Sequence, residues 1–323
     1  MASATFSPQA ETSRSSDVRK SCLLCGGNEF KRAFPGAPVR VAEPQIYRIT
    51  HSSRARVGEI LRCRGCGLML LPDCASGEAR YAAADDAAYV ADREQRIENA
   101  GLLLDVLPRA TRGRLLEVGC ACGFLLQAAR QRGFDVIGVE LSGWATEYAA
   151  RNGGLRVLQG TLASQQFEPE AFDVVVLADV IEHLADPSDE LRRIHRLLRP
   201  GGLVLILTPD IGSVTAKIAG RHWWALLDDH CCYFSRATLA RVLGQTGFRV
   251  RTCRALGRKF RAGHWVGKLS QYNPLLHRTA DKVFRLLRAS RMPVYLNLFD
   301  QMVCVAEKPD AGLPRKGQEV SHG

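Results

Sequence analysis

From about residue 112 onward, short apolar runs alternate with glycine-rich turns and with segments in which apolar residues recur every three or four positions. Short apolar runs predict buried strands, and the longer period predicts amphipathic helices. Their regular alternation predicts a mostly parallel sheet with helices on both faces. The predicted strands are residues 114–120, 135–140, 156–159, 172–180, 203–208, 248–252 and 302–306, and the predicted helices are residues 124–131, 144–152, 188–198 and 237–245.

The rest of the hydropathy pattern excludes other classes of protein. No apolar run approaches the roughly 18 residues that a membrane-spanning helix needs. Residues 1–20 lack the apolar core of a secretory signal, and we expect them, like residues 309–323, to be disordered tails. With 46% hydrophobic and 24% charged residues in 323, the chain has the composition of a folded, water-soluble protein.

Two C-x-x-C-G segments, Cys22–Gly26 and Cys63–Gly67, precede the alternating region. Each offers two thiolates to a tetrahedral ion, so Cys22, Cys25, Cys63 and Cys66 are predicted to bind one structural Zn²⁺. The alternation of apolar and polar residues between them predicts a small β ribbon, and we expect a zinc-ribbon-like module over residues 21–75. The same ligands would suit iron, and a set of unrelated core cysteines is the remaining alternative.

The chain contains eleven cysteines, an odd number. Together with the two C-x-x-C pairs, this count favours a metal site in a reducing cytoplasm over a disulfide framework. Because four ligands complete a zinc site, Cys74 is expected to play no part in it.

The first strand of the alternating region leads into a glycine-containing turn with Gly119 and Gly123. A dinucleotide-binding G-x-G-x-x-G pattern would require glycine where Ala121 and Phe124 stand, so NAD is a poor candidate. Glu140 ends the next strand, where a carboxylate can accept hydrogen bonds from both hydroxyls of a ribose. These positions predict a cofactor that carries a nucleoside but no pyrophosphate.

Four segments in this order resemble the class I S-adenosylmethionine (SAM)-dependent methyltransferases, and the resemblance covers about residues 80–308. The matching segments are Leu115–Gly123, Val136–Ser142, Phe172–Leu184 and Leu198–Pro209. Among these enzymes the chain looks most like bacterial members with a zinc-ribbon front end, including sugar methyltransferases. The resemblance implies a Rossmann-like α/β fold with a seven-stranded methyltransferase sheet, and SAM as cofactor.

The resemblance also implies roles for six residues in cofactor binding. Glu117, Gly119 and Gly123 would shape the methionine side of the pocket, Glu140 would hold the ribose, Leu141 would pack on the adenine, and Asp179 would lie near the methionine amino group or the substrate. Alternatively, the two glycines only permit a tight turn, and Asp179 only caps the helix that follows.

Two histidines are candidates for a general base. His183 follows the fourth strand at the predicted pocket mouth, and His230 lies beyond the fifth strand, with Asp229 placed to orient it. Histidine titrates in the range that proton abstraction needs. Either residue could instead be a hydrogen-bonded structural histidine.

The formal net charge of +11 is concentrated in one part of the chain. Residues 249–291 contain twelve Lys and Arg residues and a single acid, Asp281. Most of this stretch belongs to an insertion, residues 255–298, between the last two predicted strands. A basic amphipathic helix is predicted there from apolar Leu276, Ala280, Val283, Phe284 and Leu287 and from basic Arg278, Lys282 and Arg285.

The charged insertion allows several functions. It could be a solvated helical lid, a site for an anionic acceptor such as a nucleotide-linked or lipid-linked sugar, an RNA-binding surface or a peripheral membrane contact. We predict methyl transfer from SAM to a small-molecule or glycan-like acceptor. The alternative is an RNA methyltransferase, or a zinc-dependent nucleic-acid-binding protein with an inactive methyltransferase-like domain, although the N-P-P-Y type motif of base-nitrogen methylation is missing after the fourth strand.

Overall fold

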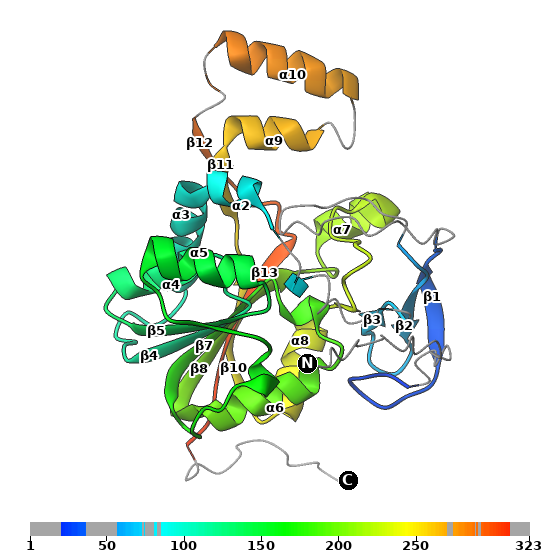
Figure 1. Ribbon diagram of the computed structural model, residues 1–323. Helices are drawn as coiled ribbons and strands as arrows, with labels where there is room; N and C mark the ends of the chain where they lie inside the picture. Colours follow the sequence, from blue (N-terminus) through cyan, green and yellow to red (C-terminus); the bar gives the residue numbers. More distant parts are fainter. Residues whose placement is uncertain are drawn as a thin grey trace, which may run out of the picture.

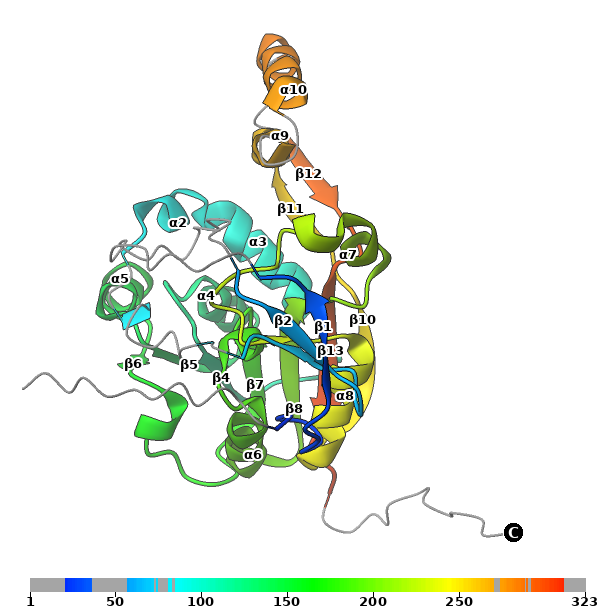
Figure 2. The ribbon, with the colours of Figure 1, turned by 90° about the vertical axis from the view of Figure 1, so that its right-hand side faces the viewer.

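The computed structural model comprises a cysteine-containing N-terminal module, an α/β body and an arm that projects from the body (Figures 1 and 2). It describes residues 21–36, 57–72, 74, 81–82, 85–269, 274–287, 289 and 292–310. The predicted tail over residues 1–20 lies outside the described residues, as does the tail predicted at the other end apart from residues 309–310.

The body is built on a seven-stranded sheet with the order β10-β13-β8-β7-β4-β5-β6. Its strands are β4 (Arg114–Val118), β5 (Asp135–Glu140), β6 (Val157–Gln159), β7 (Phe172–Ala178), β8 (Leu198–Pro209), β10 (Arg249–Ala255) and β13 (Gln301–Glu307). β13 runs antiparallel to both of its neighbours, and the pairs from β8 across to β6 are parallel. This is the predicted seven-stranded, Rossmann-like α/β sheet, and that prediction is confirmed.

Helices cover both faces of the sheet: α3, α4 and α5 lie on one face, and α6 and α8 on the other (Figures 1 and 2). The helices are α2 (Ala87–Ala91), α3 (Arg93–Leu104), α4 (Phe124–Gln131), α5 (Gly143–Gly153), α6 (Pro187–Leu197), α7 (Val214–Ala219) and α8 (Arg236–Gln245), with short 3₁₀ turns η1 (Leu162–Ser164), η2 (Ile181–His183) and η3 (Gly220–His222).

The central strands are buried on both faces, which explains their continuous apolar sequences. In β7, Val174 and Val176 join the core cluster that contains side chains of α3 and α4. Val175 and Leu177 point the other way, into the cluster that contains side chains of α6 and α8. All four side chains are fully buried, so the sheet forms a rigid platform whose strand ends can position functional groups.

The N-terminal module is joined to the body by a shared sheet with the order β1-β2-β3-β9. Its strands are β1 (Phe30–Phe34), β2 (Ile60–Cys63), β3 (Met69–Leu70) and β9 (Cys232–Tyr233), each antiparallel to its neighbours. β9 comes from the body, about 160 residues downstream of β3. Leu24 and Leu68 of the module also join the core cluster beneath α6 and α8, so module and body share one hydrophobic core.

Two disulfides join cysteines outside the C-x-x-C pairs, although the sequence favoured a metal site over a disulfide framework. Cys74 is bonded to Cys231, next to β9, and Cys253 of β10 is bonded to its cross-strand partner Cys304 of β13. Cys74 is therefore a link between the N-terminal region and the body. The sequence did not reveal these pairs because each depends on a tertiary contact between distant segments.

The arm occupies the predicted insertion between β10 and β13 and rises away from the body (Figures 1 and 2). It contains β11 (Arg258–Arg261), α9 (Ala262–Leu269), α10 (Pro274–Leu286) and β12 (Pro293–Leu296), with β11 and β12 paired antiparallel at its base. α10 is the predicted basic helix, whereas α9 and the two-stranded base were not predicted. No helix among the described residues is long and apolar enough to span a membrane.

Candidate functional site

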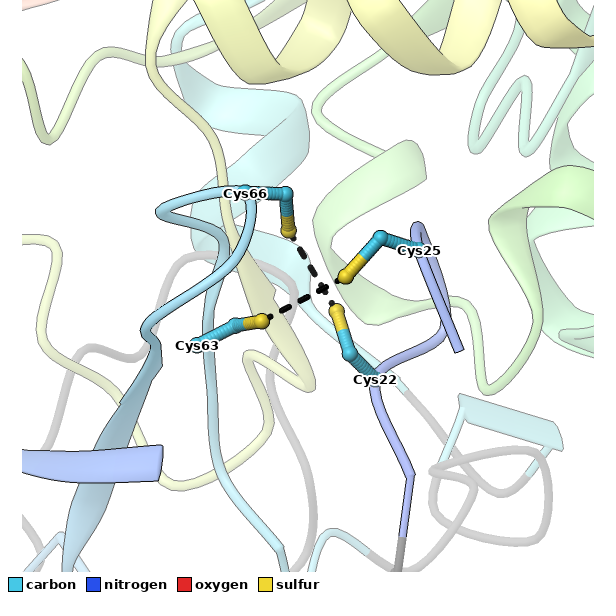
Figure 3. Close-up of side chains that lie close together, drawn as sticks. All are labelled: Cys22, Cys25, Cys63 and Cys66. Carbon is cyan, nitrogen blue, oxygen red and sulfur yellow. Dashed lines mark hydrogen bonds between the residues drawn. The ribbon is translucent and has the colours of Figure 1, made fainter. Parts of the chain in front are cut away.

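The four cysteines of the two C-x-x-C-G segments converge on one point in the N-terminal module (Figure 3). Sγ of Cys22 lies 3.4 Å from Sγ of Cys66, and Sγ of Cys25 lies 3.5 Å from Sγ of Cys63. All four sulfurs lie within 4.8 Å of one another. A tetrahedral ion with metal–sulfur bonds of about 2.3 Å separates its sulfurs by about 3.8 Å, so this donor set fits a tetrahedral metal site.

Two tight turns bring the thiols together. Gly26 and Gly67 adopt φ angles of +70° and +79°, and their N–H groups donate to the carbonyls of Cys22 and Cys63. Only glycine adopts this left-handed conformation without steric cost, which explains the glycine after each second cysteine. Burial opposes ionisation of Cys63, but hydrogen bonds from the Cys66 backbone and from the Cys25 thiol lower its pKa to about 7.

A cavity of about 250 Å³ lies at the carboxyl ends of the parallel strands, where open α/β sheets bind ligands. Each of four strands contributes the residues that follow it. The lining residues include Val139 and Glu140 at the end of β5, Leu141 after it, Leu162 after β6, Asp179 and His183 after β7, Gly119 and Ala121 after β4, and Tyr81, Tyr89 and Arg96 from the region before the sheet.

Glu140 lines this cavity with a carboxylate held in one orientation. Its Oε2 accepts a hydrogen bond from the N–H of Ala121, and its Oε1 accepts one from the N–H of Ser142, both at 2.8 Å. The two carboxylate oxygens have about four lone-pair sites in all, so the group can accept a further hydrogen bond from a ligand. Ala121 has a φ of +46°, a strained value for a residue with a Cβ, and this conformation directs its N–H at Glu140.

The three residues predicted around the first turn, Glu117, Gly119 and Gly123, differ in where they lie relative to the cavity. Gly119 lines the cavity, and a Cβ there would lie 2.6 Å from the Val180 side chain. Gly123 is not among the cavity-lining residues; a Cβ there would lie 2.4 Å from Leu155, so its glycine allows α4 and α5 to pack closely. Glu117 is buried and is not among the cavity-lining residues; burial, followed by repulsion from Glu140, raises its pKa well above the usual range.

Leu141 and Asp179 both line the cavity. Asp179 adopts a φ of +56° at the end of β7, which is a strained position for a non-glycine residue at a ligand-binding edge. Its Oδ2 accepts a hydrogen bond from Nη2 of Arg258 at 2.6 Å, and its Oδ1 accepts one from Nε2 of Gln301 at 3.2 Å. The base of the arm therefore reaches the cavity through Arg258.

His183 is the histidine that lines the cavity. Its Nδ1 lies 3.0 Å from the Asp229 carbonyl oxygen and 2.9 Å from the hydroxyl of Tyr81, which donates to Oδ2 of Asp229 at 3.0 Å. Because the carbonyl can only accept, this contact favours the tautomer with the proton on Nδ1, while Nε2 lies 3.4 Å from the same Tyr81 hydroxyl. These contacts hold the imidazole ring in one orientation.

His230 lies behind His183 and does not line the cavity. The two rings pack edge to face with their centroids 4.6 Å apart. Burial, together with the neighbouring His183, lowers the pKa of His230 to about 3, so its imidazole stays neutral. His230 therefore supports His183 by packing against its ring.

Glu182 lies beside the two histidines, and one ligand atom from each of the three residues lies within 4.8 Å of the others. Glu182 is buried and accepts a hydrogen bond from the Thr208 hydroxyl at 2.9 Å. Burial, and then the charge of Asp179, raises the pKa of Glu182 to about 8. Because groups at this spacing can share a cation, assays of this site need a metal-free condition.

Four residues at the site were missed by sequence reasoning: Tyr81, Tyr89, Arg96 and Arg258. The guanidinium of Arg96 stacks on the Tyr89 ring at 3.6 Å, and its Nε donates to the Tyr89 carbonyl. Tyr89 and Arg96 come from α2 and α3, and Tyr81 lies just before them. None belongs to a motif, and only the fold shows that this region closes over the strand ends.

The chain was compared with known proteins. A family model described as "Methyltransferase domain" matches residues 89–252, just over half of the chain. This chain belongs to the methyltransferase domain family. The match begins at Tyr89 and ends in β10, so it includes the cavity-lining strand ends but not the cysteine module or the arm.

Relatives of this methyltransferase-family chain include several proteins named ubiquinone biosynthesis O-methyltransferase. The one from Pseudomonas aeruginosa (strain UCBPP-PA14) is 35% identical over 102 residues, which are 29% of this chain and 44% of the relative. The one from Leptothrix cholodnii is 26% identical over 195 residues, 55% of this chain and 77% of the relative. The alignments with the first four of these relatives thus span less than half of each relative's length.

Solved structures similar to this methyltransferase-family chain have low sequence identity to it. A possible histamine N-methyltransferase from Thermotoga maritima is 18% identical, with a TM-score of 0.47, and the alignment covers 68% of this chain and 93% of that one. A putative methyltransferase from Bacillus halodurans is 14% identical, with a TM-score of 0.46, and the alignment covers 66% of this chain and all of that one.

Proposed function

We propose that this protein is a SAM-dependent O-methyltransferase that acts on a small-molecule hydroxyl group and carries a structural zinc ion in its N-terminal module. The observation that supports the cofactor most directly is the Glu140 carboxylate, which lines the cavity at the end of β5 and can accept a hydrogen bond from a ligand besides those from the backbone. Two adjacent ribose hydroxyls can donate to such a carboxylate as a pair.

The rest of the cavity fits the other parts of SAM. Apolar Val139, Leu141 and Leu162 lie beside Glu140 and offer a surface for adenine. Arg96 places a guanidinium in the cavity wall, where it would pair with the carboxylate of the methionine part. Asp179 would face the ammonium group. When bound, SAM supplies an electrophilic methyl group on a sulfonium.

The acceptor requires a group that removes its proton, and His183 meets the geometric requirement. Its Nδ1–H is held by Asp229 and Tyr81, so Nε2 is the atom that can take a proton from a hydroxyl in the cavity. The name of the relatives, ubiquinone biosynthesis O-methyltransferase, supports oxygen in a small molecule as the acceptor atom. In-line methyl transfer depends mainly on how well the two reactants are positioned.

The prediction of an anionic or glycan-like acceptor stays a prediction. Cations at the base of the arm, next to the body, are engaged by acids: Arg258 pairs with Asp179, and Lys259 pairs with Glu98. These two cations of the arm are thus paired within the protein. The alternative of an RNA-directed enzyme has no specific observation in its favour among the described residues.

Zinc is proposed as the metal because four thiols in a tetrahedral arrangement form a closed, structural type of site. The module contributes only short strands, and its core is shared with the body, so metal binding would supply much of its folding energy. The metal-bound module would stabilise β9, which pairs with β3. It would thereby hold the neighbouring Asp229, which orients His183, in position.

Transfer of a labelled methyl group from SAM tests this function. The purified chain is incubated with labelled SAM and separate acceptors (small hydroxylated aromatic compounds, sugar nucleotides and total RNA), with and without a chelator. We expect label on the hydroxyl oxygen of a small molecule. Incorporation into RNA alone, or into nitrogen or carbon of the small molecules, would contradict the proposal. Because a chelator would also remove metal from the four-thiol cluster, the arm with chelator is read together with thermal unfolding of the same sample.

A further inference from the structure

Large apolar side chains that are exposed to solvent are concentrated in two segments of the described chain. One segment is α7. The other lies between Val283 of α10 and Phe299, just before β13. The members of this set, which we call the arm patch, are Val214, Ile218, Val283, Leu286, Leu287, Met292, Val294, Tyr295, Leu298 and Phe299. Ile218 is 83% exposed and Leu286 is 82% exposed, so these side chains lack cover. An exposed apolar concentration of this kind marks an interaction surface.

The two segments adjoin. The hydroxyl of Thr215 on α7 donates to the carbonyl of Leu298, which joins the middle of α7 to the end of the arm. Figure 2 shows α7 directly below β12, and Figure 1 shows α7 on the arm side of the body. Val214 and Ile218 are four residues apart on α7 and therefore share one helix face. The arm patch thus extends from the arm to the body.

The outer face of α10 combines cations with apolar side chains. Its exposed positions recur in pairs at helical spacing and belong to one face: Arg278 and Thr279, Lys282 and Val283, and Leu286 and Leu287. The half-buried residues Ala280 and Phe284 lie on the other face, where α10 packs against α9. Positive charge therefore lies at the start of the outer face, and leucines lie at its end. Helices of this type bind at the boundary between lipid headgroups and acyl chains.

The charge of the segment indicates the kind of partner. Residues 249–291 contain twelve cations and one acid, and Arg278 and Lys282 are exposed on the projecting helix, far from the acids that pair with the base of the arm. A second copy of this chain would bring like charges together. A nucleic acid would leave the leucines of α10 and Phe299 in water. An anionic phospholipid surface accommodates both the cations and the apolar side chains.

We propose that the arm patch docks this protein onto an anionic membrane surface, with the apolar residues of α10, β12 and α7 entering the headgroup region and Arg278 and Lys282 contacting lipid phosphates. Such binding is peripheral and reversible, because each element inserts only one face. It does not depend on the proposed methyl transfer and can be measured without a substrate.

Co-sedimentation of the full-length chain with lipid vesicles tests this proposal. We expect binding to phosphatidylcholine vesicles that contain about one third phosphatidylglycerol, little binding to pure phosphatidylcholine, and weaker binding as salt is added. Replacing both Arg278 and Lys282 with glutamine should lower the affinity about 25-fold, since each cation near the surface contributes about fivefold. Leu286→Ser with Leu287→Ser should lower it at least about tenfold, because apolar contact with the lipid is lost.

Arg192→Gln with Arg196→Gln is the matched control, because both residues are exposed on α6, at the opposite end of the molecule from the arm (Figure 1). This control should bind like the unmodified chain. Equal binding to neutral and anionic vesicles, no binding to either, or unchanged binding of the leucine variant would overturn the proposal. So would a dimer in light scattering that the leucine variant abolishes, because a second copy would then cover the patch.

Discussion

Replacing His183 with glutamine is expected to lower kcat for methyl transfer by about 10²- to 10⁴-fold, the range that general-base catalysis contributes. Glutamine keeps a hydrogen-bonding group of similar size at the cavity wall but cannot accept the proton of a hydroxyl near neutral pH. SAM affinity should stay within about twofold, because Glu140 and the apolar residues beside it line a different part of the cavity. The measurement combines the labelled-methyl assay with calorimetry of SAM binding.

Two further variants separate a catalytic role of His183 from a structural one. His222→Gln replaces an exposed histidine of η3 and should leave kcat unchanged. Tyr81→Phe removes the hydroxyl that links His183 to Asp229 and should shift the pH profile of kcat while leaving SAM binding intact. A His183→Gln enzyme that retains more than about a third of the activity would rule out this base.

Removing the metal from the N-terminal module is expected to destabilise the protein more than any single-residue change in the body. Structural zinc in small modules contributes about 10–16 kcal/mol of apparent binding energy at neutral pH, and that energy is spent on folding. Cys63→Ser removes one of four ligands and should reduce bound zinc below about half an equivalent per chain. It should also lower the melting temperature, because β3 pairs with β9 of the body.

Elemental analysis and thermal unfolding measure this effect. Cys122→Ser is the control, because Cys122 is also a buried free cysteine but packs under α4 and α5, away from the four-thiol cluster. The control should keep a full equivalent of zinc. Iron in place of zinc, or a Cys63→Ser protein with unchanged metal content and melting temperature, would show that the structural-zinc assignment is wrong.

The local pattern of the sequence was sufficient for most of the body. The predicted bounds of α4 and β5 agree with the structure, because the apolar pattern defines both elements locally and glycines flank α4. A related reason explains why the sequence pointed to Glu140, Asp179 and His183 as candidate site residues. Each ends a buried strand or closely follows one, so the parallel sheet brings them to one edge.

Features that depend on long-range contacts could not be predicted in this way. β9 is only two residues long and becomes a strand through pairing with β3. The Cys74–Cys231 disulfide depends on the same contact. Arg96 and Tyr81 line the cavity because the region before β4 folds back over the strand ends, and no local spacing encodes this. Gly123 lay in the expected motif, but its missing side chain accommodates Leu155.

Calorimetric titration of SAM into the purified protein tests the central claim most directly. We expect saturable binding at one site per chain, weakened about 10- to 100-fold in Glu140→Gln, since a hydrogen bond to a charged group contributes about 1.5–3 kcal/mol. Glu147→Gln, which changes an exposed acid on α5, should bind SAM like the unmodified chain. Absence of SAM binding to the unmodified protein, or unchanged binding by Glu140→Gln, would contradict the proposed cofactor site.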